Sequence, residues 1–273
     1  MTQGATGKLK LVFRSNGKQT SLAEQYYKLP LQVLPPHDQD GDGTAFVYFL
    51  NPSGGILSGD RLCTELLADD NASVVATTTS NNKIYKMDDG YAGIYNDFSV
   101  GDHAALEYLP LPTVPFAGSN LRQENIFRIR GSSVLFAWDI LSPGRWRSNE
   151  IFAYDRFDSL TKIYRDGRLI VCEHILVEPG EKTLTRICVM ESYLTSASVY
   201  LCARGIPLSL KDQIQQILRS SDLRGGMTFL DREAAAIRVV ANDPLLLQEA
   251  LDAIWTAFRK QVLGKDGTKI RRY

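Results

Sequence analysis

The sequence predicts a mainly β protein whose helices are confined to its C-terminal part. From Lys8 to about Tyr200, short runs of β-branched and aromatic residues are bounded by Gly, Pro, Asn and Asp, which is typical of strands joined by turns. Apolar residues recur at helical spacing only from Ser209 onward. Neither a Pro/Ser-rich linker nor a shift in composition interrupts the 273 residues, so we expect one domain over residues 1–273.

Three kinds of strand pattern occur in the first part of the chain. Residues 8–14 alternate between apolar and charged side chains, as in a strand with one face in solvent. Residues 45–50 and 134–140 are apolar runs, which predicts strands covered on both faces. In residues 162–178 an Asp-Gly pair separates two apolar runs, so we expect a tight antiparallel hairpin.

Two helices are predicted near the end. Ser209 is a candidate N-cap for the first, whose apolar face comprises Leu210, Ile214, Ile217 and Leu218. Asp243, followed by proline, begins the second, which Gly264 ends. The apolar face of this second helix comprises Leu247, Leu251, Ile254 and Phe258. Residues 227–230 and 236–240, between the two helices, are predicted to be further strands.

Charge and composition narrow the class of protein. The 31 basic residues are balanced by 31 acidic ones, and a nucleic-acid binder would show a basic excess or a dense basic stripe. The first ten residues are polar and no apolar run is long enough to span a membrane, so we expect a cytoplasmic protein without membrane association.

The cysteines and histidines are too scattered to predict a metal site from spacing. In a reducing compartment the cysteines are most simply buried small residues. They are Cys63, Cys172, Cys188 and Cys202, and the histidines are His37, His103 and His174.

No common catalytic or nucleotide-binding motif is present, so an enzyme is not expected. Three carboxylates nevertheless lie in apolar surroundings: Asp60, Asp139 and Glu173. A charge in such a place is costly to bury unless it is paired, hydrated or bound to a cation. Alternatively, each faces solvent or pairs with an arginine such as Arg61 or Arg145. His174, next to Glu173, is expected on the opposite face of the same strand.

Two further segments are unusual in their polar and glycine content. Residues 51–60 place three glycines and Asp60 between two apolar segments, as in a packed turn or a solvated one. Residues 77–85 are rich in hydroxyls and amides, which suits either the lining of a wet interior or an exposed ladder.

Five segments in this order resemble motifs of the UreD (UreH) family of urease accessory proteins, over about residues 7 to 263. They are Gly54-Gly55-Ile56-Leu57-Ser58-Gly59-Asp60, Thr77 to Tyr85 with Thr78, Ser80 and Lys83, Leu106 to Pro112, Trp138-Asp139, and Gly144-Arg145 with Glu150. Ser58 and Asn149 replace glycines of the family pattern, and Arg271-Arg272-Tyr273 replaces its C-terminal Arg-x-Trp.

The resemblance implies a β-helix-like stack of short strands with two C-terminal helices. It also implies a scaffold without catalytic activity that binds apo-urease, UreF and, through UreF, UreG. In this family a hydrated passage is expected to carry Ni²⁺ toward the urease active site, with no tightly bound metal or other cofactor. Asp60, Asp139 and Glu173 are our candidates for the lining of that passage. A conduit must attract a divalent cation without trapping it, which scattered carboxylates do better than a closed His/Cys cage.

Two other functions stay open from the sequence. In a pure assembly scaffold, the same acids would be structural and nickel would travel elsewhere. In a β-stacked carbohydrate-active hydrolase, two of the acids would serve as general acid and base.

Overall fold

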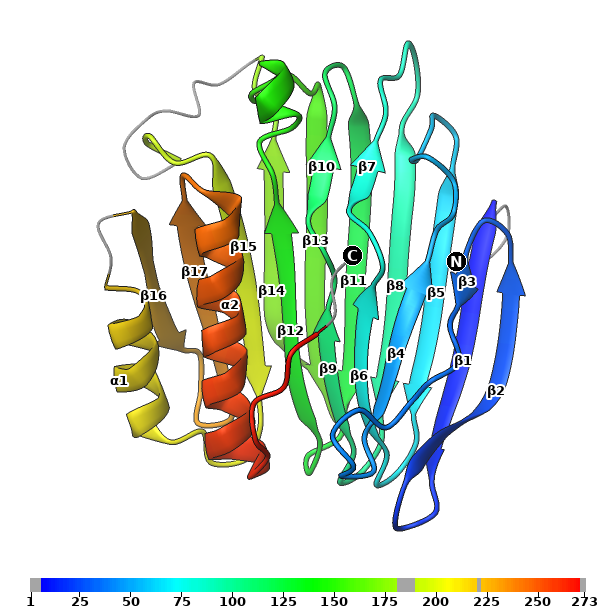
Figure 1. Cartoon of the computed structure of the whole chain (residues 1–273), viewed down its shortest axis with the longest axis vertical. Helices are drawn as coiled ribbons and strands as arrows, with labels where there is room; N and C mark the ends of the chain where they lie inside the picture. The colour runs from blue at the N-terminus through cyan, green and yellow to red at the C-terminus, as the bar shows by residue number, and fades with distance from the viewer. Residues whose placement is uncertain (1–5, 181–189, 220–221, 271–273) are drawn as a thin grey trace.

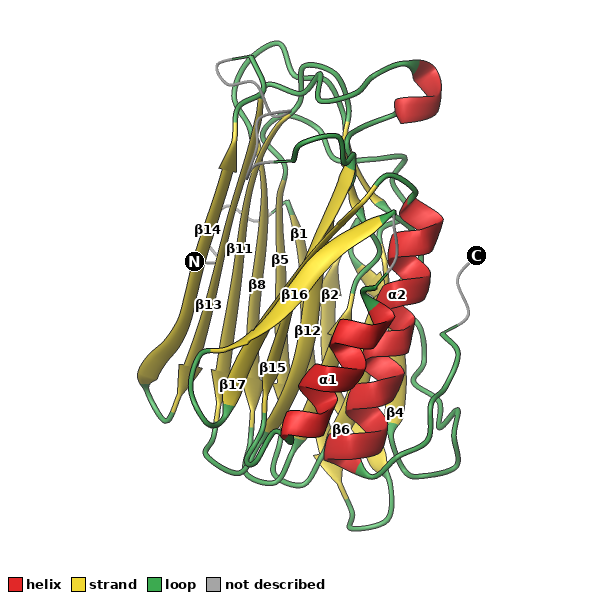
Figure 2. Cartoon of the chain, turned by 90° about the vertical axis from the view of Figure 1, so that its left-hand side faces the viewer, coloured by secondary structure: helices red, strands yellow, loops and turns green. Residues whose placement is uncertain are grey.

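The computed structural model describes residues 6–180, 190–219 and 222–270. Two β-sheets face each other, and two helices cover the outer face of one of them (Figures 1 and 2). The seven-stranded sheet comprises, in spatial order, β14 (Arg168–Val177), β13 (Arg156–Arg165), β11 (Asn120–Ile129), β8 (Ala92–Val100), β5 (Arg61–Ala68), β1 (Gly7–Ser15) and β2 (Thr20–Lys28).

The ten-stranded sheet lies opposite. Its main path comprises, in spatial order, β16 (Leu223–Phe229), β17 (Ala234–Ala241), β15 (Thr195–Cys202), β12 (Val134–Leu141), β9 (Ala105–Leu109), β6 (Ser73–Thr78), β4 (Ala45–Leu50) and β3 (Gln32–Val33). The short strands β7 (Asn82–Ile84) and β10 (Thr113–Pro115) pair with each other, and β10 also pairs with β12. In Figures 1 and 2, β16 and β17 lie beyond β14, the edge strand of the opposite sheet.

The chain winds between the two sheets and places one strand in each on every turn. β4, β6, β9 and β12 pair in parallel in one sheet, while β5, β8, β11 and β13 pair in parallel in the other. The result is a β-solenoid-like stack of about 4 turns, which confirms the predicted fold class. The antiparallel pairs of β13 with β14 and of β12 with β15 end this winding on one side.

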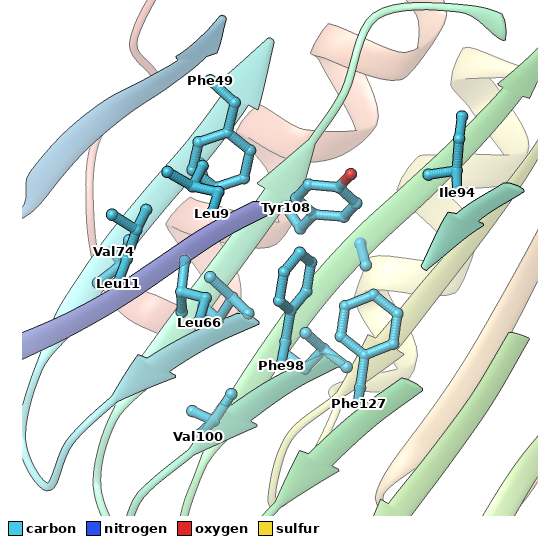
Figure 3. Packing of buried hydrophobic residues seen from close by; sticks show 14 of the residues in the cluster. Leu9, Leu11, Phe49, Leu66, Val74, Ile94, Phe98, Val100, Tyr108 and Phe127 are labelled. Atoms are coloured by element: carbon cyan, nitrogen blue, oxygen red, sulfur yellow. The ribbon is translucent and has the colours of Figure 1, made fainter. Parts of the chain in front are cut away.

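Each face of the ten-stranded sheet buries an apolar cluster. Between the sheets, Phe98 packs edge to face against Phe127 and Tyr108, with ring centroids 5.5 and 4.8 Å apart. Figure 3 shows the Tyr108 ring above these two rings, with its hydroxyl directed away from them. On the other face, α1 (Leu208–Ile217) and α2 (Pro244–Phe258) bury their apolar sides, and a π-helical turn, η2 (Arg259–Leu263), extends α2.

Most local predictions are confirmed. β13 and β14 form the predicted hairpin, with φ of +48° at Asp166 and +80° at Gly167, the backbone that a tight turn of this hand requires. Asp243 caps α2 by accepting a hydrogen bond from the Leu245 N–H at 2.9 Å. Gly264, at φ +66°, ends the helical segment.

Two local predictions are wrong. The first helix begins after Pro207, so Ser209 lies inside its first turn, where its hydroxyl donates to Gln261 rather than capping the helix. Cys172 is exposed because it lies on the outer, solvent-facing side of the edge strand β14. Cys63 and Cys202 are buried as expected, and Cys188 lies outside the described residues.

The two ends of the stack differ in the length of their connections (Figure 1). At the upper end, the turns of the stack are joined by the segments 51–60, 79–91, 110–119 and 142–155, the last of which contains the short 3₁₀ helix η1 (Trp146–Ser148). At the lower end, turns of about four residues suffice. The glycine-rich, Thr-rich and Gly-Arg motifs of the sequence therefore gather at one end of the molecule.

Among the described helices, none combines the length and the apolar character needed to cross a membrane.

Candidate functional site

At the upper end, side chains from successive turns pack on one another. The Tyr85 hydroxyl donates to the Gly54 carbonyl at 2.8 Å. A Cβ added at Gly55 would lie only 2.6 Å from the Tyr85 ring, which explains why glycine is needed there. Tyr85 in turn packs edge to face on Phe116, with ring centroids 5.1 Å apart.

The same stack continues into the next turn through an arginine. The Arg145 guanidinium lies 4.4 Å from the centre of the Phe116 ring, and its Nε donates to Glu150 at 2.9 Å. This bond raises the pKa of Arg145 and lowers that of Glu150, so both groups are held in their charged forms. We call Gly55, Tyr85, Phe116, Arg145 and Glu150 the motif stack. It ties the upper connections into one surface.

The remaining motif residues border this stack. The Thr78 hydroxyl accepts from the Leu111 N–H at 2.9 Å and so joins two motifs directly. Gly59 has φ +80°, a conformation that side chains disfavour. Asp60 is half-buried in the same turn, where its carboxylate accepts from the Leu57 N–H at 2.9 Å. Asp60 therefore holds a turn at the upper end and does not lie between the sheets.

A pocket of about 140 Å³ opens at this end and leads between the sheets. Its outer lining comes from the two motif segments and includes Ser53, Gly54, Gly55, Thr78, Ser80, Asn81, Asn82 and Lys83. Its inner end is formed by Thr64, Asn96 and Tyr108. This volume is large enough to hold several water molecules. Each of the two alternatives for residues 77–85 holds for part of the segment: Thr78 and Asn82 are half-buried in the pocket lining, whereas Ser80, Asn81 and Lys83 are exposed.

From the inner end of the pocket, polar side chains form a single row across the seven-stranded sheet. Thr64 is paired in register with Asn96, Asn96 with Asn125, Asn125 with Thr161, and Thr161 with Glu173. All of them point between the sheets, and all except the half-buried Glu173 are buried. We call these residues the polar row.

Hydrogen bonds join most of the row. Asn96 Nδ2 donates to Asn125 Oδ1 at 2.8 Å, and Asn125 Nδ2 approaches Thr161 Oγ1 at 3.5 Å. Thr161 also interacts with Tyr200 of the opposite sheet, whose hydroxyl donates to Glu173. A continuous chain of polar groups therefore runs from the pocket to the edge strand β14.

Asp139 faces the row from the ten-stranded sheet. Its Oδ2 accepts from Gln123 Nε2 at 2.8 Å and from the Ser159 hydroxyl at 3.2 Å. Burial, together with the charge of nearby Glu173, raises the pKa of Asp139 to about 6. Part of the Asp139 surface is nonetheless accessible to a water-sized probe. Asp139 is therefore screened from bulk solvent without being completely enclosed.

Glu173 lies where the row reaches the side of the molecule. Its Oε1 accepts from Arg238 Nε at 2.6 Å, and its Oε2 accepts from the Tyr200 hydroxyl. Burial raises the pKa of Tyr200 and so keeps its hydroxyl protonated. His174 lies on the opposite, outer face as predicted, where it bonds to Asp158 at 2.8 Å.

The structure thus brings Asp139 and Glu173 together and leaves Asp60 apart from them. Sequence reasoning missed the amides and hydroxyls of the row and the arginine that pairs with Glu173. The available signal was one polar residue at an inward position of each strand, as in Leu62-x-Thr64-x-Leu66 and Ile94-x-Asn96-x-Phe98. Within the described ranges, no three side chains of His, Cys, Asp or Glu come close enough to hold a metal ion.

The family model and the similar proteins found by comparison carry the same description. A family model described as the UreD urease accessory protein matches residues 5–272. The chain is 26% identical over 275 residues to the urease accessory protein UreD of Staphylococcus saprophyticus, which covers 99% of this chain and 98% of that protein. It is also 26% identical over 272 residues to the protein of the same name from Staphylococcus aureus strain JH9, with 98% of each chain covered.

Proposed function

Because the chain belongs to the UreD family of urease accessory proteins, we propose that it acts in urease maturation as a scaffold without catalytic activity of its own. In this proposal it binds apo-urease and UreF, reaches UreG through UreF, and helps to pass Ni²⁺ toward the urease active site. The ion is cargo, carried by a hydrated passage between the two sheets and not held as a resident cofactor.

The polar row is the observation that supports the passage. Its amide and hydroxyl oxygens are weak ligands for a divalent cation, and Asp139 and Glu173 add negative charge along the route. Such a lining attracts a cation without holding it as a cage of thiolates and imidazoles would. A purely structural core has little reason to place so many polar groups between two sheets, since each must be satisfied to avoid a penalty.

The pocket at the upper end is the proposed entrance. It ends at Asn96 and Tyr108, so an ion moving further displaces the hydrogen bonds between row side chains. Each neutral hydrogen bond contributes only about 1 kcal/mol net. An amide or hydroxyl that loses its hydrogen bond to a neighbour can bind the ion instead. The lining therefore opposes stepwise movement only weakly.

Exposed apolar side chains around the entrance support the role of a scaffold. Leu57, Tyr91, Trp146 and Ile151 are between 39 and 54% exposed, and all belong to the upper connections. A protein partner seated on the motif stack would cover these side chains and the mouth of the pocket together.

The test is nickel-dependent activation of apo-urease by this protein with UreF and UreG. We expect Asp139→Asn and Glu173→Gln each to lower activation at least tenfold while UreF still co-purifies with the variant. Glu124→Gln is the matched control, because Glu124 lies on the outer face of β11 and pairs there with Lys162 at 3.6 Å. Full activation by both row variants would remove the passage and leave a docking platform.

The motif stack alone would suit a pure assembly scaffold, which is the main alternative. That function predicts that the row variants either activate urease normally or fail to fold, and an unfolding curve beside the activation assay separates these cases. A carbohydrate-active hydrolase is disfavoured because Asp139 lies between two sheets, which pack only ~10 Å apart and leave no room for a sugar chain. Turnover of a polysaccharide by the protein alone would support the hydrolase alternative.

A further inference from the structure

The end of the polar row at Glu173 has an unusual position. β14 is the edge of its sheet, whereas the opposite sheet continues through β15 to β17 and β16 (Figure 2). Side chains of β15 and β17 therefore cover Glu173, while among the described residues no further strand of its own sheet lies beside it. The row thus reaches the side of the molecule at this point.

A positively charged side chain closes this end. Arg238, on β17, donates from Nε to Glu173 at 2.6 Å, and a second guanidinium nitrogen also contacts the same carboxylate oxygen. The guanidinium further lies 5.3 Å from the centre of the Tyr200 ring. Since Tyr200 donates to the other carboxylate oxygen, both oxygens of Glu173 are occupied.

The two partners differ in exposure. The Arg238 side chain is 45% exposed, whereas that of Glu173 is 18% exposed. Arg238 is thus anchored to an interior carboxylate but has solvent beside it. A long, flexible side chain in this position can leave Glu173 and move its charge into water, so it needs no other buried partner.

We propose that Arg238 is a displaceable plug that holds Glu173 until a divalent cation, arriving along the polar row, takes its place and leaves through the side of the molecule. This inference rests on the proposed nickel passage and names its second end. A cation at Glu173 and the guanidinium repel each other, so only one of them occupies the carboxylate at a time. The return of Arg238 then expels the ion, which prevents Glu173 from becoming a trap.

The row itself supports this assignment. Except for Glu173, its residues are neutral, and Asp139 has the neutral partners Gln123 and Ser159. Among the described residues that face the row, Arg238 is therefore the cation paired with a row carboxylate. An arginine that served only to neutralise buried charge would be expected beside Asp139, because Asp139 lies deeper between the sheets than Glu173.

The test is equilibrium binding of Ni²⁺ to the purified full-length protein, measured by competition with a chromophoric chelator. We expect Arg238→Gln to bind Ni²⁺ on the order of tenfold more tightly, because the competing charge is removed, and Arg238→Lys to stay near the original affinity. The gain should vanish in the double variant Arg238→Gln with Glu173→Gln. Arg224→Gln is the matched control, since Arg224 lies on the same sheet in β16 but pairs with Glu191 at 2.6 Å.

Unchanged Ni²⁺ affinity in Arg238→Gln, or a gain that persists when Glu173 is replaced, would overturn the plug. If Arg238→Gln does not fold, Arg238→Lys still provides a test, because it keeps the positive charge. Ni²⁺ should dissociate from Arg238→Lys no more slowly than from the original protein. Failure of the passage has a different signature, namely normal urease activation by Glu173→Gln whatever the affinity of the arginine variants. Reduced activation by Glu173→Gln with unchanged affinity in Arg238→Gln would keep the passage and reject the plug.

Discussion

Glu107 and Asp139 lie on neighbouring strands of the ten-stranded sheet, β9 and β12, but on opposite faces of it. Glu107 faces the helices and is completely buried; its carboxylate lies 3.4 Å from Arg259 Nε and accepts from the Trp255 indole. Asp139 faces the other sheet and accepts from the neutral groups of Gln123 and Ser159. Burial raises the pKa of both acids, to about 7 for Glu107 and to about 6 for Asp139.

The difference lies in what surrounds each acid. Arg259 also donates to Asp40 at 2.9 Å, and the cluster thereby ties the end of α2 to the loop before β4. We call Glu107, Arg259 and Asp40 the lock, an ionic cluster that links helix and sheet; the raised pKa of Glu107 means that Arg259 offsets only part of the cost of burying this carboxylate. Asp139, in contrast, has no arginine or lysine among its hydrogen-bond partners, and its raised pKa means that its ionisation lowers the stability of the fold. The ionic cluster at the helices and the proposed nickel passage thus lie on opposite faces of one sheet.

The largest expected effect tests the lock. Arg259→Met leaves Glu107 and Asp40 without their shared cation, and losing one partner of a buried pair costs about 3–5 kcal/mol. We expect this loss in the free energy of unfolding, measured with urea at pH 8. The loss should shrink at pH 5, where protonation of Glu107 removes its need for a counter-charge.

Phe258→Leu provides a control for packing alone. Phe258 lies next to Arg259 and is fully buried in the same cluster, so this change should cost stability equally at pH 5 and pH 8. A loss below about 1 kcal/mol in Arg259→Met would mean that the outer face does not depend on charge pairing.

The next prediction is a gain in the free energy of unfolding, and it concerns Asp139, on the face of the ten-stranded sheet that lies opposite the other sheet. The pKa of Asp139 is raised from 3.8 to about 6, so ionisation destabilises the folded protein progressively between pH 4 and pH 6. Asp139→Asn should remove this cost and stabilise the protein by up to about 3 kcal/mol above pH 7, with no gain below pH 4. Urea unfolding across this pH range measures the effect.

The same variant should activate urease poorly if the passage is used. A more stable but less active protein would separate function from folding directly. If Asp139→Asn were less stable than the original at pH 8, the contrast between the two faces would be lost.

A smaller effect on stability is expected within the row. Asn125→Leu removes the shortest hydrogen bond of Asn96 and one partner of Thr161, which costs about 1–3 kcal/mol, and it should interrupt urease activation. Phe127→Leu, two residues further along the same face of β11, should cost about 1 kcal/mol by loss of packing and leave activation intact. Equal activation by the two variants would contradict a special role of the row.

The contrast between the faces was only partly predictable from the sequence. Strand alternation is a local property, so the hairpin, the long strands and the capped helix at Asp243 were predicted correctly. Asp139 and Glu173 stood out because each interrupts an apolar run. Glu107 did not stand out as a charge, although it is completely buried.

The remaining features depend on which strands become neighbours. Thr64, Asn96, Asn125 and Thr161 are separated by 32, 29 and 36 residues, and this uneven spacing hides the repeat in the sequence. Only the stacking of the turns brings them into one row. The pairing of Glu173 with Arg238, 65 residues away, likewise depends on β17 extending past β14.

The smallest expected effect concerns Lys265, at the partly exposed edge of the ionic cluster around Arg259. Lys265 contacts Asp42 at 3.0 Å and the Ser73 hydroxyl at 3.1 Å, and its side chain is 22% exposed. Since a partly exposed ion pair contributes at most about 1 kcal/mol, Lys265→Gln should lower the free energy of unfolding by less than that, and 0.5 M salt should reduce the difference. The loss from Arg259→Met should persist in the same salt because its partners are buried. A loss of equal size in both variants would show that the lock acts through the whole C-terminal segment and not through the buried pair.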